Sequence, residues 1–414
     1  MGFSPPIYDN LRWAEAHPTR SNKNTMKNNR TFLEKLLDGA KVEWKPLKDI
    51  LIRTKGTKIT AAEMKVLHKD NAPLKIFAGG KTFALVNFED IPEKDINKNP
   101  SIIVKSRGII EFEYYDKPFS HKNEMWSYYS NDKNINIKYI YYVLKNQEPY
   151  FQNLGSKMQM PQIATPDTDK YLVPIPPLSV QTEIVKILDA LTALTSELTS
   201  ELILRQKQYE YYREKLLSFD SLEQLNSGGG KKKLIDVAIY AKSRISTDKL
   251  DKENYIGVEN LLQNKLGKTS SNYVPTEGSF IEYLPNDILI GNIRPYLRKI
   301  WLADKTGGTN GDVLVIRLTD ENIISHYLYH ILANEHFFEY NVKYSKGAKM
   351  PRGDKTAILQ YEFDVPPLEE QHRIVSILDK FETLTNSITE GLPLAIEQSQ
   401  KRYEYYRELL LNFS

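Results

Sequence analysis

The chain is organised by a block that occurs twice, as Pro176-Pro-Leu-Ser-Val-Gln-Thr-Glu-Ile-Val-Lys-Ile-Leu-Asp189 and as Pro366-Pro-Leu-Glu-Glu-Gln-His-Arg-Ile-Val-Ser-Ile-Leu-Asp379. A second block follows each copy, first as Tyr209-Glu-Tyr-Tyr-Arg-Glu214 and then as Tyr403-Glu-Tyr-Tyr-Arg-Glu408. Two matches in the same order indicate an internal duplication. The second copy carries a short insertion between its two blocks.

Each copy predicts a long helix that follows a Pro-Pro pair, because Pro ends the preceding strand and is tolerated at a helix start. Seam residues recur at alternating steps of four and three, the pattern of a coiled coil. The first helix, expected over residues 178–217, would be about 60 Å long. The seam of the first helix includes Ile184, Leu188, Leu191, Leu198, Leu202, Tyr209 and Tyr212, and that of the second includes Ile374, Leu378, Phe381, Ile388, Tyr403 and Tyr406.

The second helix should be interrupted. Gly391-Leu-Pro393 predicts a kink, and the insertion has the length of a heptad stutter. The natural partner of each seam is the other copy, so we expect an antiparallel coiled coil. Glu34-Lys-Leu-Leu37 repeats as Glu214-Lys-Leu-Leu217, which indicates a cyclically permuted, pseudo-two-fold unit.

Two dissimilar globular regions flank the first helix. Short β-rich runs occur at 101–105 and 108–112, and again at 287–290 and 312–317. The expected fold class is α+β, with two small α/β domains separated by two long helices. The expected boundaries are a tail at 1–30, domains at 31–173 and 234–363, spacer helices at 174–220 and 364–414, and a linker at 221–233.

Composition excludes several classes of protein. A length of 414 residues suits two or three domains. No apolar run is long enough for a membrane span, and no secretion leader is visible in residues 1–30, where Met26 is an alternative natural start. The absence of Cys excludes disulfides, thiolate zinc sites and Cys nucleophiles, and fits a cytoplasmic protein. The net charge of +3 neither requires nor excludes a nucleic-acid partner.

The repeated blocks resemble the conserved regions of the specificity subunits of type I restriction–modification complexes. Phe32-Leu-Glu-Lys-Leu-Leu-Asp-Gly39 with Val42-Glu-Trp-Lys-Pro46 is similar to their usual N-terminal opening, and Asp287-Ile-Leu-Ile-Gly-Asn-Ile-Arg-Pro-Tyr-Leu297 with Gly311-Asp312 is similar to their target-recognition domains. The resemblance covers about residues 31–414.

This resemblance implies a protein that reads DNA without chemistry of its own. Two target-recognition domains would each read one part of a split double-stranded DNA site. The helices would hold the domains apart and dock two adenine methyltransferase subunits, which nuclease–translocase restriction subunits then join. No cofactor, metal or membrane is implied for this chain.

Candidate DNA contacts are residues that can neutralise phosphates or reach base edges from turns and loops. Arg294 can fork onto a guanine edge, and Asn292 or Asn310 can pair with adenine. Small residues at Gly155 and Gly347, in loops that precede the closing strand of each half, would let the backbone approach the duplex. The full set is Lys105, Arg107, His121, Lys122, Lys157, Gln159, Asn292, Arg294, Tyr296, Arg298, Asn310, Lys346, Lys349, Arg352 and Lys355.

These candidate contacts, and several other polar residues, also have an interpretation that involves no ligand. A single exposed Lys or Arg is more often a solvated surface charge, and the seam Tyr residues favour helix packing. His326, His330 and His336 fall on a predicted helix, where a structural role is favoured over catalysis or metal binding. The acidic run at 166–170 is interpreted as a turn. We find no methyl-transfer motif, phosphate-binding loop or His-Glu-x-x-His pair, and so expect neither a catalytic nor a metal site.

Two other classes of function stay open. The first is a methyltransferase or nuclease with cryptic catalytic residues, which methyl-donor binding or DNA cleavage by the chain alone would favour. The second is a coiled-coil scaffold or RNA-binding protein, which failure to bind duplex DNA with a methyltransferase partner would favour. A specificity subunit of a methylation-only or type IIB-like complex is a third, related alternative.

The spacer helix contains a tandem repeat, Thr195-Ser-Glu-Leu198 followed by Thr199-Ser-Glu-Leu202. Each tetrapeptide adds about 6 Å of helix. Because one base pair occupies about 3.4 Å, each tetrapeptide corresponds to nearly two base pairs. We therefore expect this helix to act as a ruler for the gap in the DNA site.

Overall fold

The computed structural model describes residues 31–156, 160–217, 230–387 and 390–413. The predicted tail at 1–30 lies outside the described residues, as does most of the predicted linker. The chain divides into two compact units, Met1–Ala190 with Tyr403–Ser414, and Leu191–Arg402. Within the described part of the chain, we find no helix with the length and hydrophobicity that a bilayer crossing requires.

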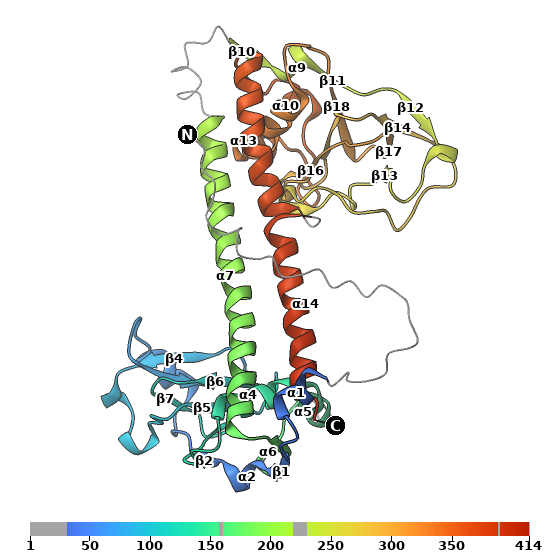
Figure 1. Cartoon of the computed structure of the whole chain (residues 1–414). Coiled ribbons are helices and arrows are strands. Elements are labelled where there is room, and N and C mark those ends of the chain that lie inside the picture. Colours follow the sequence, from blue (N-terminus) through green and yellow to red (C-terminus); the bar gives the residue numbers. More distant parts are fainter. Residues whose placement is uncertain (1–30, 157–159, 218–229, 388–389, 414) are drawn as a thin grey trace, which may run out of the picture. The chain divides into compact units, whose positions relative to one another are not determined.

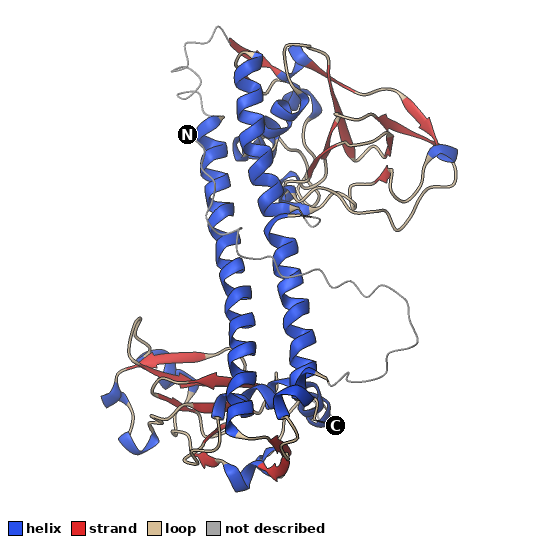
Figure 2. Ribbon diagram, viewed as in Figure 1, coloured by secondary structure: helices blue, strands red, loops and turns tan. Residues whose placement is uncertain are grey.

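The first unit is built from three small sheets with helices (Figures 1 and 2). A four-stranded sheet has the order β2-β8-β5-β6, a three-stranded sheet has the order β4-β3-β7, and β1 pairs with β9. Its strands are β1 (Glu43–Pro46), β2 (Ile52–Thr54), β3 (Leu74–Phe77), β4 (Phe83–Val86), β5 (Ser101–Lys105), β6 (Glu111–Tyr115), β7 (Phe119–His121), β8 (Trp126–Tyr129) and β9 (Leu172–Ile175). Its helices are α1 (Phe32–Leu37), α2 (Leu47–Ile50), α3 (Ala61–Leu67), α4 (Ile137–Asn146), α5 (Glu148–Gly155), α6 (Thr165–Asp169), the start of α7 (Leu178–Leu216) and the end of α14 (Gly391–Leu411).

The second unit repeats this plan. Its sheets have the orders β11-β18-β15-β16 and β12-β14-β17-β13, and β10 pairs with β19. The strands are β10 (Gly230–Lys233), β11 (Ala238–Tyr240), β12 (Arg244–Ser246), β13 (Tyr255–Ile256), β14 (Ser279–Tyr283), β15 (Ile288–Gly291), β16 (Ile300–Leu302), β17 (Gly307–Thr309), β18 (Val313–Leu318) and β19 (Glu362–Val365). The helices are α9 (Leu234–Val237), α10 (Ser325–Leu332), α11 (Glu335–Lys343), α12 (Lys355–Leu359), α13 (Leu368–Asn386) and α14 (Gly391–Leu411).

The duplication is confirmed at the level of structure, since β2-β8-β5-β6 and β11-β18-β15-β16 have the same order and the same antiparallel pairing. Some predicted boundaries need correction. Residues 230–233 of the predicted linker form β10, which pairs along its whole length with β19. The acidic run at 166–170 is not a simple turn, because most of it lies in the short helix α6.

The ends of the long helices belong to the hydrophobic cores of the domains. In the first unit, Ile184 and Leu188 of α7 share one core with Leu33 of α1 and with Leu410 and Leu411 of α14. In the second unit, Tyr209 of α7 joins the core that contains Ile374 and Leu378 of α13. This sharing of helix ends agrees with the cyclic permutation that the sequence predicted.

The second long helix is broken where the sequence predicted a kink. Helix α13 ends at Asn386 and α14 begins at Gly391, and Ile388 lies outside the described residues. Gly391 has φ of +81°, a left-handed conformation that favours glycine. A Cβ atom there would lie 2.6 Å from the carbonyl oxygen of Thr383, so the first position of α14 requires glycine.

Within the second unit, α7 runs antiparallel to α13 and α14. The hydroxyls of Thr195 and Ser399 are 2.8 Å apart, whereas further along α7 the rings of Tyr209 and Tyr212 stack on Phe381. Leu191, Leu198 and Leu202 are half-buried between these points. The predicted antiparallel seam is therefore present, with partially exposed residues in its middle.

Candidate nucleic-acid interface

Two loops that the sequence predicted as separate candidates are joined in the second unit. The backbone N–H of Arg294 donates to the carbonyl of Pro351 at 2.7 Å, and that of Gly353 donates to the carbonyl of Asn292 at 3.1 Å. Lys346 and Arg352 exchange two backbone hydrogen bonds of 2.8 Å. These bonds tie the loop after β15 to the loop before α12 and form one surface, which we call the paired-loop surface.

The paired-loop surface of the second unit is basic and accessible. Its exposed side chains are Arg294, Tyr296, Lys346, Lys349, Arg352 and Lys355. Arg352 lies 3.2 Å from Asp312, and Lys346 lies 2.5 Å from Asp354. Within the described residues, no side-chain partner faces Arg294 or Lys349, so their charges are available to a ligand.

The backbone on this surface is strained. Arg294 has φ of +54° and Arg298 has φ of +51°, a region that non-glycine residues rarely adopt. These two residues flank a short 3-10 turn over Pro295–Leu297, which leaves the Tyr296 ring half exposed. The Arg298 guanidinium is engaged in an ion pair with Glu335. Such strain is typical of residues held for recognition.

The two predicted adenine-reading residues lie deeper than the arginines. Asn292 is buried, and a Cβ at Gly353 would be 2.8 Å from its Oδ1 atom and 2.4 Å from the Oδ1 atom of Asn341. Asn310 is half-buried and accepts a hydrogen bond of 3.1 Å from the N–H of Asp312. Asn292 therefore packs the base of the loop pair, and Asn310 fixes the turn before β18.

The first unit contains the same loop pair. The N–H of Gly108 donates to the carbonyl of Pro161 at 2.9 Å, and the N–H of Ile163 donates to the carbonyl of Ser106 at 3.0 Å. Arg107 is exposed on this surface, and Lys122 is half-buried beside Glu124 at 2.7 Å. Lys157 and Gln159 lie outside the described residues.

Two candidates of the first unit lie in its interior. Lys105 is 6% exposed and is held by Glu111 at 2.6 Å and Glu113 at 2.9 Å. His121 is fully buried, with its Nε2 atom 3.2 Å from the Thr54 hydroxyl, and burial lowers the pKa of its imidazole. Neither side chain is exposed to a ligand in this conformation.

The glycines of the two loops have different roles. Gly347 is exposed with φ of +104°, as a tight surface turn requires. Gly155 instead is buried at the end of α5, where a Cβ would lie 2.3 Å from Ile110 Cδ1. The expectation that both glycines let the backbone approach DNA is therefore corrected for Gly155, whose small size serves internal packing.

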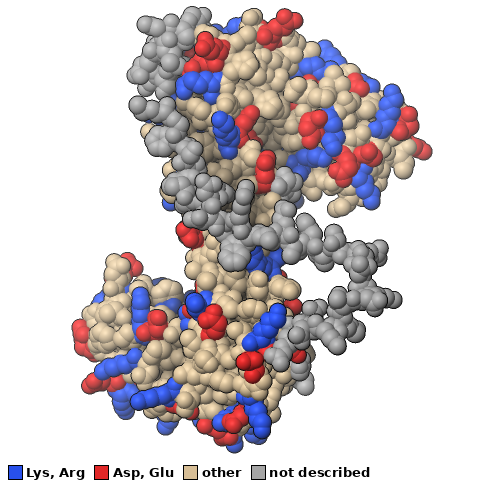
Figure 3. Space-filling view, viewed as in Figure 1, with Lys and Arg blue, Asp and Glu red and all other residues tan. Residues whose placement is uncertain are grey.

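A basic cleft in the first unit was missed by sequence reasoning. This cleft of about 580 Å³ is lined by residues that include Arg53, Lys55, Lys94 and Asn123. Arg53 forms an ion pair of 2.6 Å with Asp169. The clustering of Arg53, inside β2, with Lys55 and Lys58, which follow β2, was the available signal in the sequence. On the face shown in Figure 3, basic and acidic side chains are interspersed on each unit, so the described residues of that face form no single broad basic patch.

The attachment of each domain to its long helix is fixed by a buried glutamine of the repeated block. Gln371 accepts a hydrogen bond from the N–H of Ile324 at 2.9 Å and donates to the carbonyls of Asn322 and Pro366 at 2.9 and 2.8 Å. Gln181 makes the equivalent bonds with the backbone of Asn136, Asn134 and Pro176. Because the bonded groups are all backbone atoms, the domains can diverge in sequence without losing this attachment.

Replacing Gln371 with Ala should lower the free energy of unfolding by about 2–4 kcal/mol, because buried backbone groups lose their partners. The urea midpoint of the full chain measures this effect. Gln400→Ala, at an exposed position of α14, is the matched control. Equal midpoints for the two variants would contradict the proposed importance of this attachment.

Comparison with known proteins places the two domains in one family. The family model described as "Type I restriction modification DNA specificity domain" matches residues 41–205 and 227–398. A putative type I restriction enzyme specificity subunit of Haemophilus influenzae is 38% identical over 94% of this chain and 100% of its own length. The EcoR124I/EcoR124II specificity subunit of Escherichia coli is 34% identical over 92% of this chain and 97% of its own length.

The fold has a solved counterpart. The crystal structure of the type I restriction–modification S subunit from M. genitalium matches with a TM-score of 0.60, at 15% sequence identity, over 91% of this chain and 98% of that one. At this identity the match supports the fold alone.

Proposed function

Because the chain belongs to the family of type I restriction–modification specificity subunits, we propose that it reads a double-stranded DNA target in two parts and does no chemistry itself. The observation that carries this proposal is the paired-loop surface, which both units build with the same backbone bonds and with different side chains. The same backbone arrangement with different side chains in the two units suits two half-sites of different sequence. The proposed setting is the cytoplasm, where bacterial DNA is accessible.

The proposed DNA contacts are narrower than the sequence alone indicated. In the second unit they are Arg294, Tyr296, Lys346, Lys349, Arg352 and Lys355, and in the first unit Arg107, Lys122, Lys157 and Gln159. Lys105, His121 and Asn292 are left out because they are buried, Arg298 because Glu335 holds it, and Asn310 because its side-chain oxygen is already bonded. Lys55 and Lys94 of the basic cleft are added as phosphate contacts.

The long helices are proposed to recruit two methyltransferase subunits, to which the restriction subunits then add. Tyr211 and Tyr405 occupy the same place in the repeated Tyr-Glu-Tyr-Tyr-Arg-Glu block, and their side chains are 57% and 62% exposed. The first Tyr of each block is engaged within the chain, because its ring forms a cation–π pair with the Arg of the same block. These pairs are Tyr209 with Arg213 and Tyr403 with Arg407. An exposed Tyr at the same place in both copies supports two equivalent docking sites, because aromatic residues are favoured at interfaces.

Arg294 and Lys349 should respond differently to substitution. Arg294→Ala should weaken binding of the cognate duplex by about 5–150-fold, equivalent to about 1–3 kcal/mol, and relax the preference at one base. Lys349→Ala should weaken all duplexes alike and reduce the salt dependence by about one phosphate contact. Equilibrium binding by the complex with its methyltransferase, at several salt concentrations, measures both effects.

Lys380→Ala is the matched control, since Lys380 is exposed on α13 away from the loops. If Arg294→Ala weakened cognate and unrelated duplexes equally, Arg294 would be a phosphate contact rather than a base reader. Methyl-donor binding or DNA cleavage by the purified chain alone would instead favour an enzyme. A complex that binds no duplex DNA would favour a scaffold or RNA-binding protein.

A further inference from the structure

The last aspartate of each repeated block fixes a domain helix, but the two halves use different partners. In the first half, Asp189 accepts from the Lys138 ammonium at 2.7 Å and from the Tyr142 hydroxyl at 2.5 Å. In the second half, Asp379 lies 3.1 Å from Nδ1 of His326 and 2.8 Å from Nε2 of His330. A cation therefore neutralises Asp189, whereas two imidazoles face Asp379.

A second carboxylate joins the cluster in the second half only. Glu382 follows Asp379 by almost one turn of α13 and accepts a hydrogen bond of 3.0 Å from the Tyr329 hydroxyl. Ligand atoms of His330, Asp379 and Glu382 lie within 4.8 Å of one another. At the corresponding positions of the first half stand Tyr142, Asp189 and Thr192, which do not form a comparable donor set.

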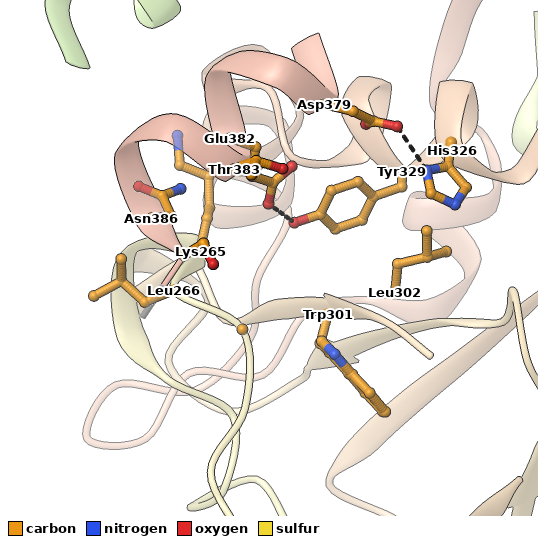
Figure 4. A pocket seen from close by; sticks show the side chains of 12 residues that line it. Lys265, Leu266, Trp301, Leu302, His326, Tyr329, Asp379, Glu382, Thr383 and Asn386 are labelled. Carbon is orange, nitrogen blue, oxygen red and sulfur yellow. Dashed lines mark hydrogen bonds and ion pairs between the residues drawn. The ribbon is translucent and has the colours of Figure 1, made fainter. Parts of the chain in front are cut away.

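The cluster borders a cavity. His326, Tyr329, Asp379 and Glu382 line a pocket of about 430 Å³, together with Lys265 and Trp301 (Figure 4). The His330 ring is fully buried, and its Nδ1 atom has no hydrogen-bond partner in the described part of the chain. The carboxylates are thus accessible from the pocket, while the imidazole behind them is incompletely satisfied.

We propose that His330, Asp379 and Glu382 bind one divalent transition-metal ion of the Zn²⁺ class, with His326 holding Asp379 in place or completing the ligand set. Imidazole together with carboxylates favours Zn²⁺ over Mg²⁺ or Ca²⁺, which take oxygen ligands. Tetrahedral Zn²⁺ with ligands at about 2.0–2.1 Å places ligand atoms roughly 3.3 Å apart. The His330–Asp379 separation is 2.8 Å, and all three ligand atoms lie within 4.8 Å of one another, so side-chain adjustment without movement of the helices can bring them to that spacing.

Binding requires one exchange at the cluster. The proton between Nε2 of His330 and Asp379 must give way to the ion, and the neutral imidazole then carries its single proton on Nδ1 while Nε2 binds the metal through its lone pair. The ion would then join α10 to α13, as the Lys138 ion pair joins α4 to α7 in the first unit. The metal would thereby reinforce, in the second unit, an attachment that the first unit makes with a lysine.

The test uses the full chain, stripped with a chelator and titrated with Zn²⁺, with bound metal measured after gel filtration. We expect about one Zn²⁺ per chain. Glu382→Gln and His330→Gln should each weaken binding at least tenfold, whereas Asp189→Asn in the first half should bind as the wild type does. Zn²⁺ should also raise the melting temperature of the wild type more than that of Glu382→Gln.

Co²⁺ provides a readout that does not depend on the folding of any variant. Co²⁺ added to the stripped wild-type chain should give the visible absorption bands of a tetrahedral site, and Zn²⁺ should remove them. Failure of the folded wild-type chain to retain Zn²⁺, or equal affinity in wild type and folded Glu382→Gln, would overturn the proposal. DNA binding plays no part in these measurements, so either result leaves the recognition proposal standing.

Discussion

Deleting residues 195–198 from α7 is expected to shorten the gap between the two halves of the DNA site by nearly two base pairs. Four helical residues correspond to about 6 Å of length and about 40° beyond a full turn. The tandem tetrapeptides are identical, so Thr199 would take the place of Thr195 opposite Ser399, whose hydroxyls are now 2.8 Å apart. The Thr–Ser contact would be kept, while the part of α7 beyond it would be shifted by about 6 Å and turned by about 40°.

Mapping of modified adenines in cells that carry the deletion variant and its methyltransferase measures the gap directly. The double variant Ser196→Ala with Glu197→Ala is the matched control, since both residues are exposed and helix length is unchanged. Both half-sites should keep their sequences in the deletion variant, and only their separation should change. A gap identical to that of the wild type would contradict the hypothesis that the length of α7 sets the gap.

Exchanging residues 234–361 for the corresponding segment of a relative should replace one half-site completely and leave the other half-site and the gap unchanged. The exchanged segment carries the second paired-loop surface, while β10, β19 and the long helices stay in place. The glutamine that fixes this domain bonds only to backbone groups, so a donor with different side chains can make the same bonds. We therefore expect recognition and attachment to be separable.

The same methylation mapping tests the exchange. A reciprocal exchange of residues 47–171, between β1 and β9, is the control and should alter the other half-site alone. If either exchange changed both half-sites, the two domains would not read DNA independently. If neither changed any base, recognition would reside in the helices or in a partner subunit.

Much of the fold was predictable because it depends on local pattern. The seam predicted a helix over 178–217, and α7 spans Leu178–Leu216. The run at 101–105 is β5, and the runs at 287–290 and 312–317 are β15 and β18 displaced by one residue. The run at 108–112 was misplaced, because residues 108–110 form the turn into β6. Apolar periodicity and Pro positions act over short distances, which a sequence displays directly.

The candidate site was less predictable because burial depends on distant partners. In the sequence Lys105 reads as a lysine at the surface, but the folded domain buries it. The neighbouring strand β6 brings Glu111 and Glu113 within ion-pair distance of its ammonium group. His330 gave no metal signal in the sequence, since Asp379 and Glu382 lie far along the chain and meet it only when α10 packs on α13. Likewise, the pairing of the loops near Arg294 and Pro351 requires the folded domain.

The most direct test of the central claim is sequencing of modified adenines in cells that carry this chain together with its methyltransferase. We expect modification at two short specific sequences separated by a fixed gap of unspecified bases, and no modification when the chain is absent. Modification at one continuous sequence, or a pattern that persists without the chain, would contradict it.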